Sequence, residues 1–214
     1  TGADSDYESL DGENLLAAQV AGKVLLQAQQ LFGVINSISA IAEGAGVNEN
    51  QAVLSTVAAL SENIASGNLD LSNIVGSDLT DANGNADAKS EAALTGLLST
   101  ALSKNTLTQS FANDATILAE ASQSMIKVNS VLGESLLAPE SALGSDARAA
   151  SLITQNDLKS SFKSIGALDP EVAAAQITSK LSSFKNVDEI KTNYRDVYKE
   201  TIQARADSQG GIVA

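Results

Sequence analysis

The sequence predicts an all-α protein, a bundle of long antiparallel helices that allows two helical sub-bundles. Apolar residues recur at spacings of three and four along most of the 214 residues, which is the period of an amphipathic helix. Only two prolines, Pro139 and Pro170, interrupt the chain. No segment alternates between apolar and polar residues in the way that a half-buried strand does.

The first predicted helix is long and runs from Asp11 to Glu43. Its apolar stripe consists of Val24, Ala28, Leu31, Ile35, Ile38 and Ala42. Gly44-Ala45-Gly46 ends this helix, because glycine tolerates the left-handed turn. A second helix follows the N-cap residue Asn48 and stops at Gly67.

The rest of the chain continues helix after helix. The segment from Asn68 to Asp87 is polar and predicts at most one short helical turn. Further helices are predicted over residues 88–103, 108–132, 145–154, 156–165, 170–184 and 188–206. The Asp169-Pro170 pair marks a helix start, because aspartate caps a helix and proline suits its first position.

Residues 133–144 contain Pro139 and are the best candidate domain boundary. The charge also changes near this point. Residues 1–147 carry 18 acidic and 4 basic side chains, a net charge of −14, whereas residues 148–214 carry 8 and 9, a net charge of +1. We therefore predict an acidic helical bundle over 1–138 and a smaller, near-neutral helical segment over 139–214, which can also pack as one domain.

The composition narrows the function. The chain has no histidine, cysteine or tryptophan. Histidine is the usual general base and the commonest metal ligand, and cysteine is a frequent nucleophile, so most catalytic sites cannot be built and we expect a protein that is not an enzyme. The net charge of −13 opposes nucleic-acid binding. No apolar run reaches the roughly 18 residues of a transmembrane span, so we expect no membrane insertion.

Oxygen-bearing side chains alternate in the segment before the third helix. They are Asp81, Asn83, Asn85 and Asp87, followed by Glu91. Such alternation around a glycine wraps hard oxygen donors around Ca²⁺, so these residues are a candidate calcium site. The match to an EF-hand loop is incomplete, because Ala86 replaces the glycine and Glu91 comes one position early. The alternative is a polar turn whose Asp87 caps the next helix.

A second candidate calcium site lies at the acidic start of the chain. Its residues are Asp4, Asp6, Glu8 and Asp11. Their carboxylates repel one another unless a cation lies among them. The alternative is a solvated acidic terminus before a helix whose positive dipole end favours carboxylates.

The last predicted helix carries a candidate interaction surface for a protein partner. Lys191, Arg195 and Lys199 are spaced four apart on one stripe, and Tyr194 and Tyr198 lie beside it. This stripe is suited to an acidic partner, including the acidic part of another copy of the chain. The alternative is an exposed face of mixed charge.

Three segments resemble a helical region of large calcium-binding bacterial surface and secreted proteins. They are residues 12–20 (GENLLAAQV), 57–60 (VAAL) and 68–72 (NLDLS). Proteins of that kind often carry repeats-in-toxin, cadherin-like or adhesin modules. The resemblance implies an extracellular or bacterial cell-surface location in calcium-rich surroundings. The Gly-Gly-x-Gly-x-Asp nonapeptide of a calcium roll is absent from this sequence.

These observations predict a non-catalytic structural or interaction module of a bacterial secreted or cell-surface protein, with calcium stiffening its loops. The alternative is a self-assembling subunit of an extracellular filament or surface layer. A third hypothesis is a hydrolase that uses only carboxylates. Against the third stands the shortage of aromatic side chains, which make up 3% of the residues and which sugar-binding sites use as platforms.

Overall fold

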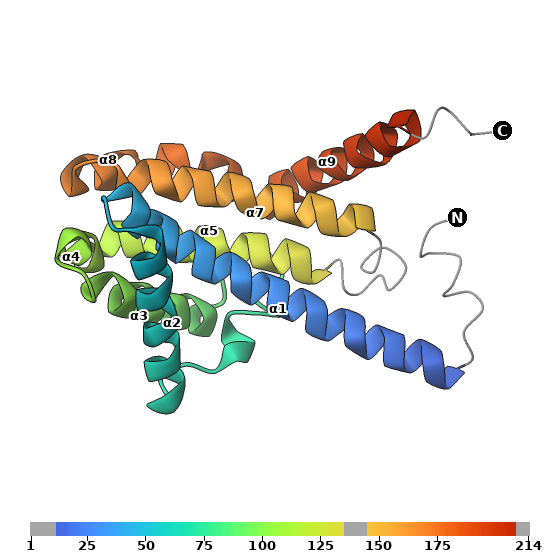
Figure 1. Ribbon diagram of the computed structural model, residues 1–214, viewed down its shortest axis with the longest axis horizontal. Coiled ribbons are helices and arrows are strands. Elements are labelled where there is room, and N and C mark those ends of the chain that lie inside the picture. Colours follow the sequence, from blue (N-terminus) through green and yellow to red (C-terminus); the bar gives the residue numbers. More distant parts are fainter. Residues whose placement is uncertain (1–11, 135–144, 209–214) are drawn as a thin grey trace.

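The computed structural model describes residues 12–134 and 145–208 and confirms the all-α fold (Figure 1). Its α-helices are α1 Gly12–Gly44, α2 Glu49–Ala65, α3 Ala88–Ser103, α4 Gln109–Ala112, α5 Ala115–Glu134, α7 Ser145–Gly166, α8 Pro170–Lys180 and α9 Val187–Ser208. Short 3₁₀ turns lie at Leu71–Asn73, Thr106–Thr108 and Ser182–Phe184. Within the described residues, strand-type pairing is limited to one isolated bridge between Thr80 and Ala86.

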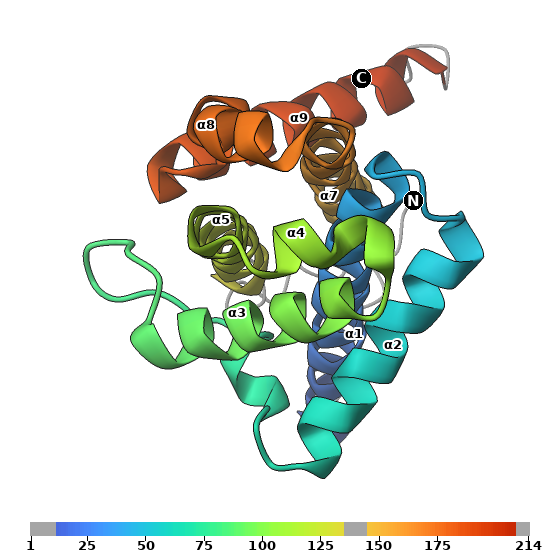
Figure 2. The same cartoon turned by 90° about the vertical axis from the view of Figure 1, so that its left-hand side faces the viewer.

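Helix α5 occupies the centre of the bundle. It contacts α1, α3 and α4 on one side and α7, α8 and α9 on the other (Figure 2). Six of its core side chains are at most 1% exposed: Ile117, Ala121, Met125, Ile126, Val128 and Leu132. A helix covered by neighbours on most of its surface is held by packing rather than by its own propensity.

The predicted apolar stripe of helix α1 is covered in the second half of the helix and exposed in the first half. Val24 is 60% exposed, and Ala28 is also exposed, although both belong to the predicted stripe. Ile38 and Ala42 are buried as predicted, whereas Leu26, Val34 and Ile41 are buried outside the predicted stripe. The first half of α1 extends past the other helices (Figure 1), so neighbours cover a narrower face there, and Leu26 rather than Val24 lies on that face.

A buried glutamine connects α1 to the centre of the bundle. Gln30 is fully buried, and its Nε2 donates to the carbonyl oxygens of Asn129 at 2.6 Å and Gly76 at 2.9 Å. Its Oε1 accepts from the Gly76 N–H at 2.9 Å. Asn129 in turn donates through Nδ2 to the Ile74 carbonyl at 2.8 Å. All the polar atoms of the Gln30 amide therefore have partners, which is the condition for burying it without a large penalty.

The carboxyl ends of α1 and α7 approach each other backbone to backbone. A Cβ added at Gly166 would lie 2.0 Å from the carbonyl oxygen of Ile41, and one added at Gly44 would lie 2.2 Å from that of Lys163. No side chain fits at either position. These two glycines set how closely the two helices pack.

The predicted helix over 108–132 is in fact two helices. Asp114 interrupts it, because its Oδ1 accepts from the N–H groups of Thr116 at 2.9 Å and Ile117 at 3.0 Å and so caps α5. The short α4 precedes this cap. The Asn-Asp pair at 113–114 is typical of a helix cap, but the apolar pattern continues across it and therefore predicted a single helix.

The sequence also predicted a break between two helices near Asn156, and this prediction is wrong. Helix α7 is continuous from Ser145 to Gly166. Gln155 lies inside it and is buried, with Nε2 donating to the Gln29 carbonyl of α1 at 3.0 Å. Packing against α1 therefore holds a polar stretch in helical form. The predicted helix over 170–184 ends early, with α8 stopping at Lys180 before a 3₁₀ turn.

One buried cluster joins both parts of the chain. It contains Ile38 and Leu98 from the first part together with Phe162 and Ile177 from the second. The division at residue 139 is thus not a division of the core. The division of the chain into residues 1–138 and 139–214 stays a prediction.

One described helix segment, Val20–Gly44 of α1, is long and apolar enough to cross a membrane by length and composition. Half of this segment is buried inside the protein. Core helices of soluble proteins and signal sequences meet the same criterion. The expectation of no membrane insertion therefore stays a prediction.

Candidate functional site

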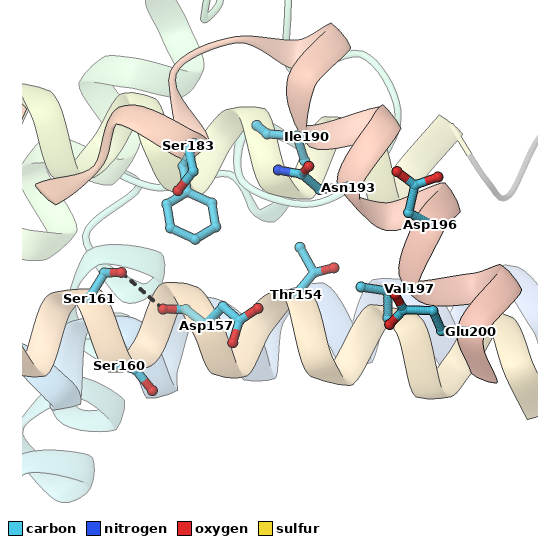
Figure 3. A pocket seen from close by; sticks show the side chains of 11 residues that line it. Thr154, Asp157, Ser160, Ser161, Ser183, Ile190, Asn193, Asp196, Val197 and Glu200 are labelled. Atoms are coloured by element: carbon cyan, nitrogen blue, oxygen red, sulfur yellow. Dashed lines mark hydrogen bonds between the residues drawn. The ribbon is translucent and has the colours of Figure 1, made fainter. Parts of the chain in front are cut away.

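A groove of about 560 Å³ lies between α7 and α9 and is the main candidate site (Figure 3). We call it the acidic groove. Its lining residues are Thr154, Asp157, Ser160, Ser161, Ser183, Phe184, Ile190, Asn193, Asp196, Val197 and Glu200. They come from α7, from the 3₁₀ turn before α9 and from α9 itself. A groove of this size falls within the roughly 300–1,000 Å³ typical of ligand pockets.

The floor of the acidic groove is apolar and belongs to the core. Phe184 and Ile190 are 7% and 2% exposed and are part of the buried cluster. Thr154 is buried as well, donates to the Ala150 carbonyl at 3.0 Å and projects from α7 into the space under α9 (Figure 3). Because its floor is packed into the core, the groove is formed without any ligand.

Among the described residues that line the acidic groove, the charged groups are all carboxylates. Asp157 comes from α7, and Asp196 and Glu200 come from α9 one turn apart. Among the described residues, Asp157 and Glu200 have no ion pair, and Asp196 has only Lys199 Nζ at 4.0 Å. The groove therefore presents negative charge on both of its walls.

The capped start of α9 fixes one wall of the groove. Asn186 Oδ1 accepts from the N–H groups of Asp188 at 2.8 Å and Glu189 at 3.3 Å. The sequence predicted α9 to begin at Asp188, within one residue of its observed first residue. It did not predict the groove, because that depends on α7 and α9 lying side by side. The one available signal is the four-residue spacing of Asp196 and Glu200.

The predicted calcium loop at 81–87 lines a second, polar pocket of about 380 Å³. Across this pocket stand the lysines 127, 185 and 191 and the start of α9. Lys127 Nζ donates to the Lys185 carbonyl at 2.7 Å, and burial together with the Lys185 charge lowers the pKa of Lys127. Three lysines and two aspartates, Asp81 and Asp188, line this pocket, so its charge does not favour Ca²⁺ binding.

The loop itself is closed by its own hydrogen bonds. Asp81 Oδ1 accepts from the N–H groups of Asn83 at 2.8 Å and Asn85 at 2.9 Å, and Oδ2 accepts from Asn85 Nδ2 at 3.3 Å. The Asn85 hydrogen bonds are the main cause of a lowered pKa at Asp81. Gly84 adopts a φ of +75°, as the turn requires.

The two remaining predicted ligands, Asp87 and Glu91, form hydrogen bonds elsewhere. Asp87 caps α3, with Oδ2 accepting from the N–H groups of Lys89 at 2.9 Å and Ser90 at 3.2 Å. Glu91 accepts from Gln123 Nε2 at 3.0 Å. Within the described ranges, no cluster of three carboxylates is arranged to hold a metal ion. Calcium binding at this loop stays a prediction, and the cap at Asp87 matches the alternative.

The second predicted calcium site cannot be compared with the structure. Asp4, Asp6, Glu8 and Asp11 lie outside the described residues.

The predicted interaction stripe on α9 is divided between two environments. Lys191 lines the polar pocket, and Tyr194 packs against the core. Tyr198 is half-buried, whereas Arg195 and Lys199 are exposed. Docking of a partner through the whole stripe stays a prediction.

The fold and the site together define a class of protein: a helical bundle with an acidic groove whose floor is apolar. No protein-family model, no curated protein and no solved structure matches this chain.

Proposed function

We propose that this chain is a non-catalytic interaction module of a bacterial secreted or cell-surface protein, and that the acidic groove is its docking surface. The observation that carries the proposal is the groove itself. It combines a preformed apolar floor with walls that carry carboxylates, which is the anatomy of a recognition site. The bacterial extracellular setting rests on the sequence resemblance.

The composition supports a binding role over a catalytic one. The chain has no histidine or cysteine, so neither can serve as base or nucleophile in the groove. The serine and threonine hydroxyls there have no imidazole to activate them. Ser161 and Thr154 donate instead to the backbone carbonyls of Asp157 and Ala150.

A matched pair of tryptophan substitutions tests the proposal. Asn193→Trp fills the groove, whereas Thr192→Trp puts the same bulk on the neighbouring exposed position of α9, outside the groove lining. Each immobilised protein is exposed to secreted and surface proteins of the producing bacterium, and the retained partner is quantified. We expect wild type and Thr192→Trp to retain the same partner and Asn193→Trp to lose it. Equal retention by both variants, or none by wild type, contradicts the proposal.

A second candidate is a hydrolase that uses only carboxylates. It is favoured by Asp157 and Glu200, which lie on opposite walls of one groove, as glycoside hydrolysis requires of its two acids. Both residues are exposed, whereas a general acid of this kind occupies apolar, water-poor surroundings. Release of reducing sugar from a polysaccharide panel, abolished by Asp157→Asn, would establish this function in place of the first.

A further inference from the structure

We infer that the acidic groove binds a basic protein segment in which arginine or lysine residues flank an apolar side chain. This inference rests on the proposed docking function and names the chemistry of its partner. It follows from three features of the groove: the arrangement of its charges, the nature of its floor and its length.

The arrangement of charge favours a cationic partner. Asp157 stands on the α7 wall, Asp196 and Glu200 stand on the α9 wall, and no lysine or arginine is among the described residues that line the groove. Two separate cationic side chains can reach these walls. Arginine suits them best, because its planar guanidinium binds a carboxylate through two parallel hydrogen bonds.

The floor favours an apolar side chain between the two cations. Phe184 and Ile190 lie at the bottom, and Val197 lies half-buried beside them. An apolar group that enters covers the exposed part of Val197 and the little surface that Phe184 and Ile190 leave exposed, which stabilises the complex. A basic segment without an apolar residue would leave the floor uncovered.

The length of the groove favours a short peptide segment. On α9 its lining runs from Ile190 to Glu200, which spans about 15 Å at the helical rise per residue. An extended segment of about four or five residues covers that distance.

Two other occupants fit less well. A single metal ion needs its carboxylates together, and the described residues contain no cluster of three that could hold one. A second copy of this chain carries a net charge of −13, and the mutual repulsion of two such molecules opposes pairing at low salt. A basic partner meets no such repulsion.

The test uses amide NMR spectra of the ¹⁵N-labelled chain and three short peptides. The probe is acetyl-Gly-Arg-Leu-Arg-Gly-amide, and the controls replace both arginines with glutamine or the leucine with serine. We expect the probe to shift the amide signals of Thr154, Ser183 and Asn193, and each control peptide to bind more weakly. Because the attraction is between charges, the probe's affinity must also fall as salt is raised.

A matched pair of triple variants tests the acids. Asp157→Asn, Asp196→Asn and Glu200→Gln together remove the groove charges and should weaken the probe's binding about tenfold, since each exposed charge pair contributes only modestly. The control combines Glu49→Gln, Glu171→Gln and Glu189→Gln, which change the net charge equally at exposed positions outside the groove. The control should keep wild-type affinity. Thermal melts verify that both variants are folded.

Several results would overturn the inference. These are equal binding of the glutamine peptide, shifts confined to other surfaces, or equal loss in both triple variants. Shifts of the groove amides with millimolar Ca²⁺ alone, or with protein concentration alone, would assign the groove to a metal ion or to a second copy. If the peptides fail while Asn193→Trp still loses its natural partner, the docking function stands and only the partner's chemistry is wrong.

Discussion

At the scale of single residues, buried polar groups fix the arrangement of the helices. Gln30 joins α1, α5 and the segment between α2 and α3 through hydrogen bonds to Gly76 and Asn129. Another glutamine of the same helix, Gln27, is exposed. The sequence pattern gave no reason to choose between these glutamines, because burial here is decided by partners from distant parts of the chain.

Gln30→Leu should destabilise the fold by about 1–3 kcal/mol, because it removes the hydrogen bonds that the fully buried Gln30 amide forms with Gly76 and with the Asn129 carbonyl. Gln27→Leu is the control and should change stability by less than about 0.5 kcal/mol, as is usual for surface substitutions. Urea unfolding followed by circular dichroism measures both. Equal effects of the two substitutions would show that the Gln30 hydrogen bonds are not decisive.

The lowered pKa of Asp81 predicts that the stability of its loop depends on pH. Hydrogen bonds from Asn85 lower its pKa below the ordinary 3.8, so the folded state favours the carboxylate. The resulting stabilisation is complete above pH 3.8 and is lost as the pH falls through the lowered value. We expect amide protection at Asn83 and Asn85 to fall over that acidic range.

Asp81→Asn is the matched variant, because it preserves an acceptor oxygen but removes the titrating group. Its loop amides should show no such acid-dependent loss, as measured by amide exchange corrected for intrinsic rates. An unchanged acid response in this variant would assign the effect to another carboxylate.

At the scale of helices, the contacts between α1 and α7 depend on glycine. Gly166→Ala should destabilise the protein by about 2 kcal/mol or more, because the new Cβ meets the Ile41 carbonyl and forces the helices apart. Gly96→Ala is the control within α3, where nothing lies within 4 Å of an added Cβ. It should stabilise by about 0.5–1 kcal/mol through helix propensity. Thermal or urea unfolding distinguishes the two, and destabilisation by both would contradict the close approach.

Most of the helices could be predicted from local signals. Caps such as Asn48, Asp87 and Asp169 accept from backbone N–H groups as their positions suggested. The errors arose where tertiary packing overrode local sequence. Gln155 is held helical by contact with α1, and the exposed Val24 has no neighbour to cover it. Local patterns contain neither piece of information.

At the scale of the whole molecule, the net charge of each part of the chain does not indicate where the acidic groove lies. The near-neutral second part, not the strongly acidic first part, carries the acidic groove. Asp157, Asp196 and Glu200 were not predicted as a site, because α7 and α9 are separated in sequence by a helix and two turns. Regional net charge cannot reveal how two helices combine their carboxylates.

Calcium should leave the stability of the whole molecule unchanged. The Asp81 loop is closed by its own amides and faces lysines, so we expect equal melting temperatures in millimolar Ca²⁺ and in chelator. Scanning calorimetry makes this comparison. A rise in melting temperature with Ca²⁺ that Asp81→Asn abolishes would instead establish the calcium site predicted from the sequence.

The central structural claim is that one core holds both walls of the acidic groove, and native-state hydrogen exchange tests it most directly. Leu158 and Phe162 of α7 and Ile190 of α9 belong to the same buried cluster as Met125 of α5. Their amides should therefore exchange through the same global unfolding, with equal free energies and equal denaturant dependence. Exchange at residues 158–190 through a separate opening of lower free energy would contradict the claim and show that the carboxy-terminal helices form an independent unit.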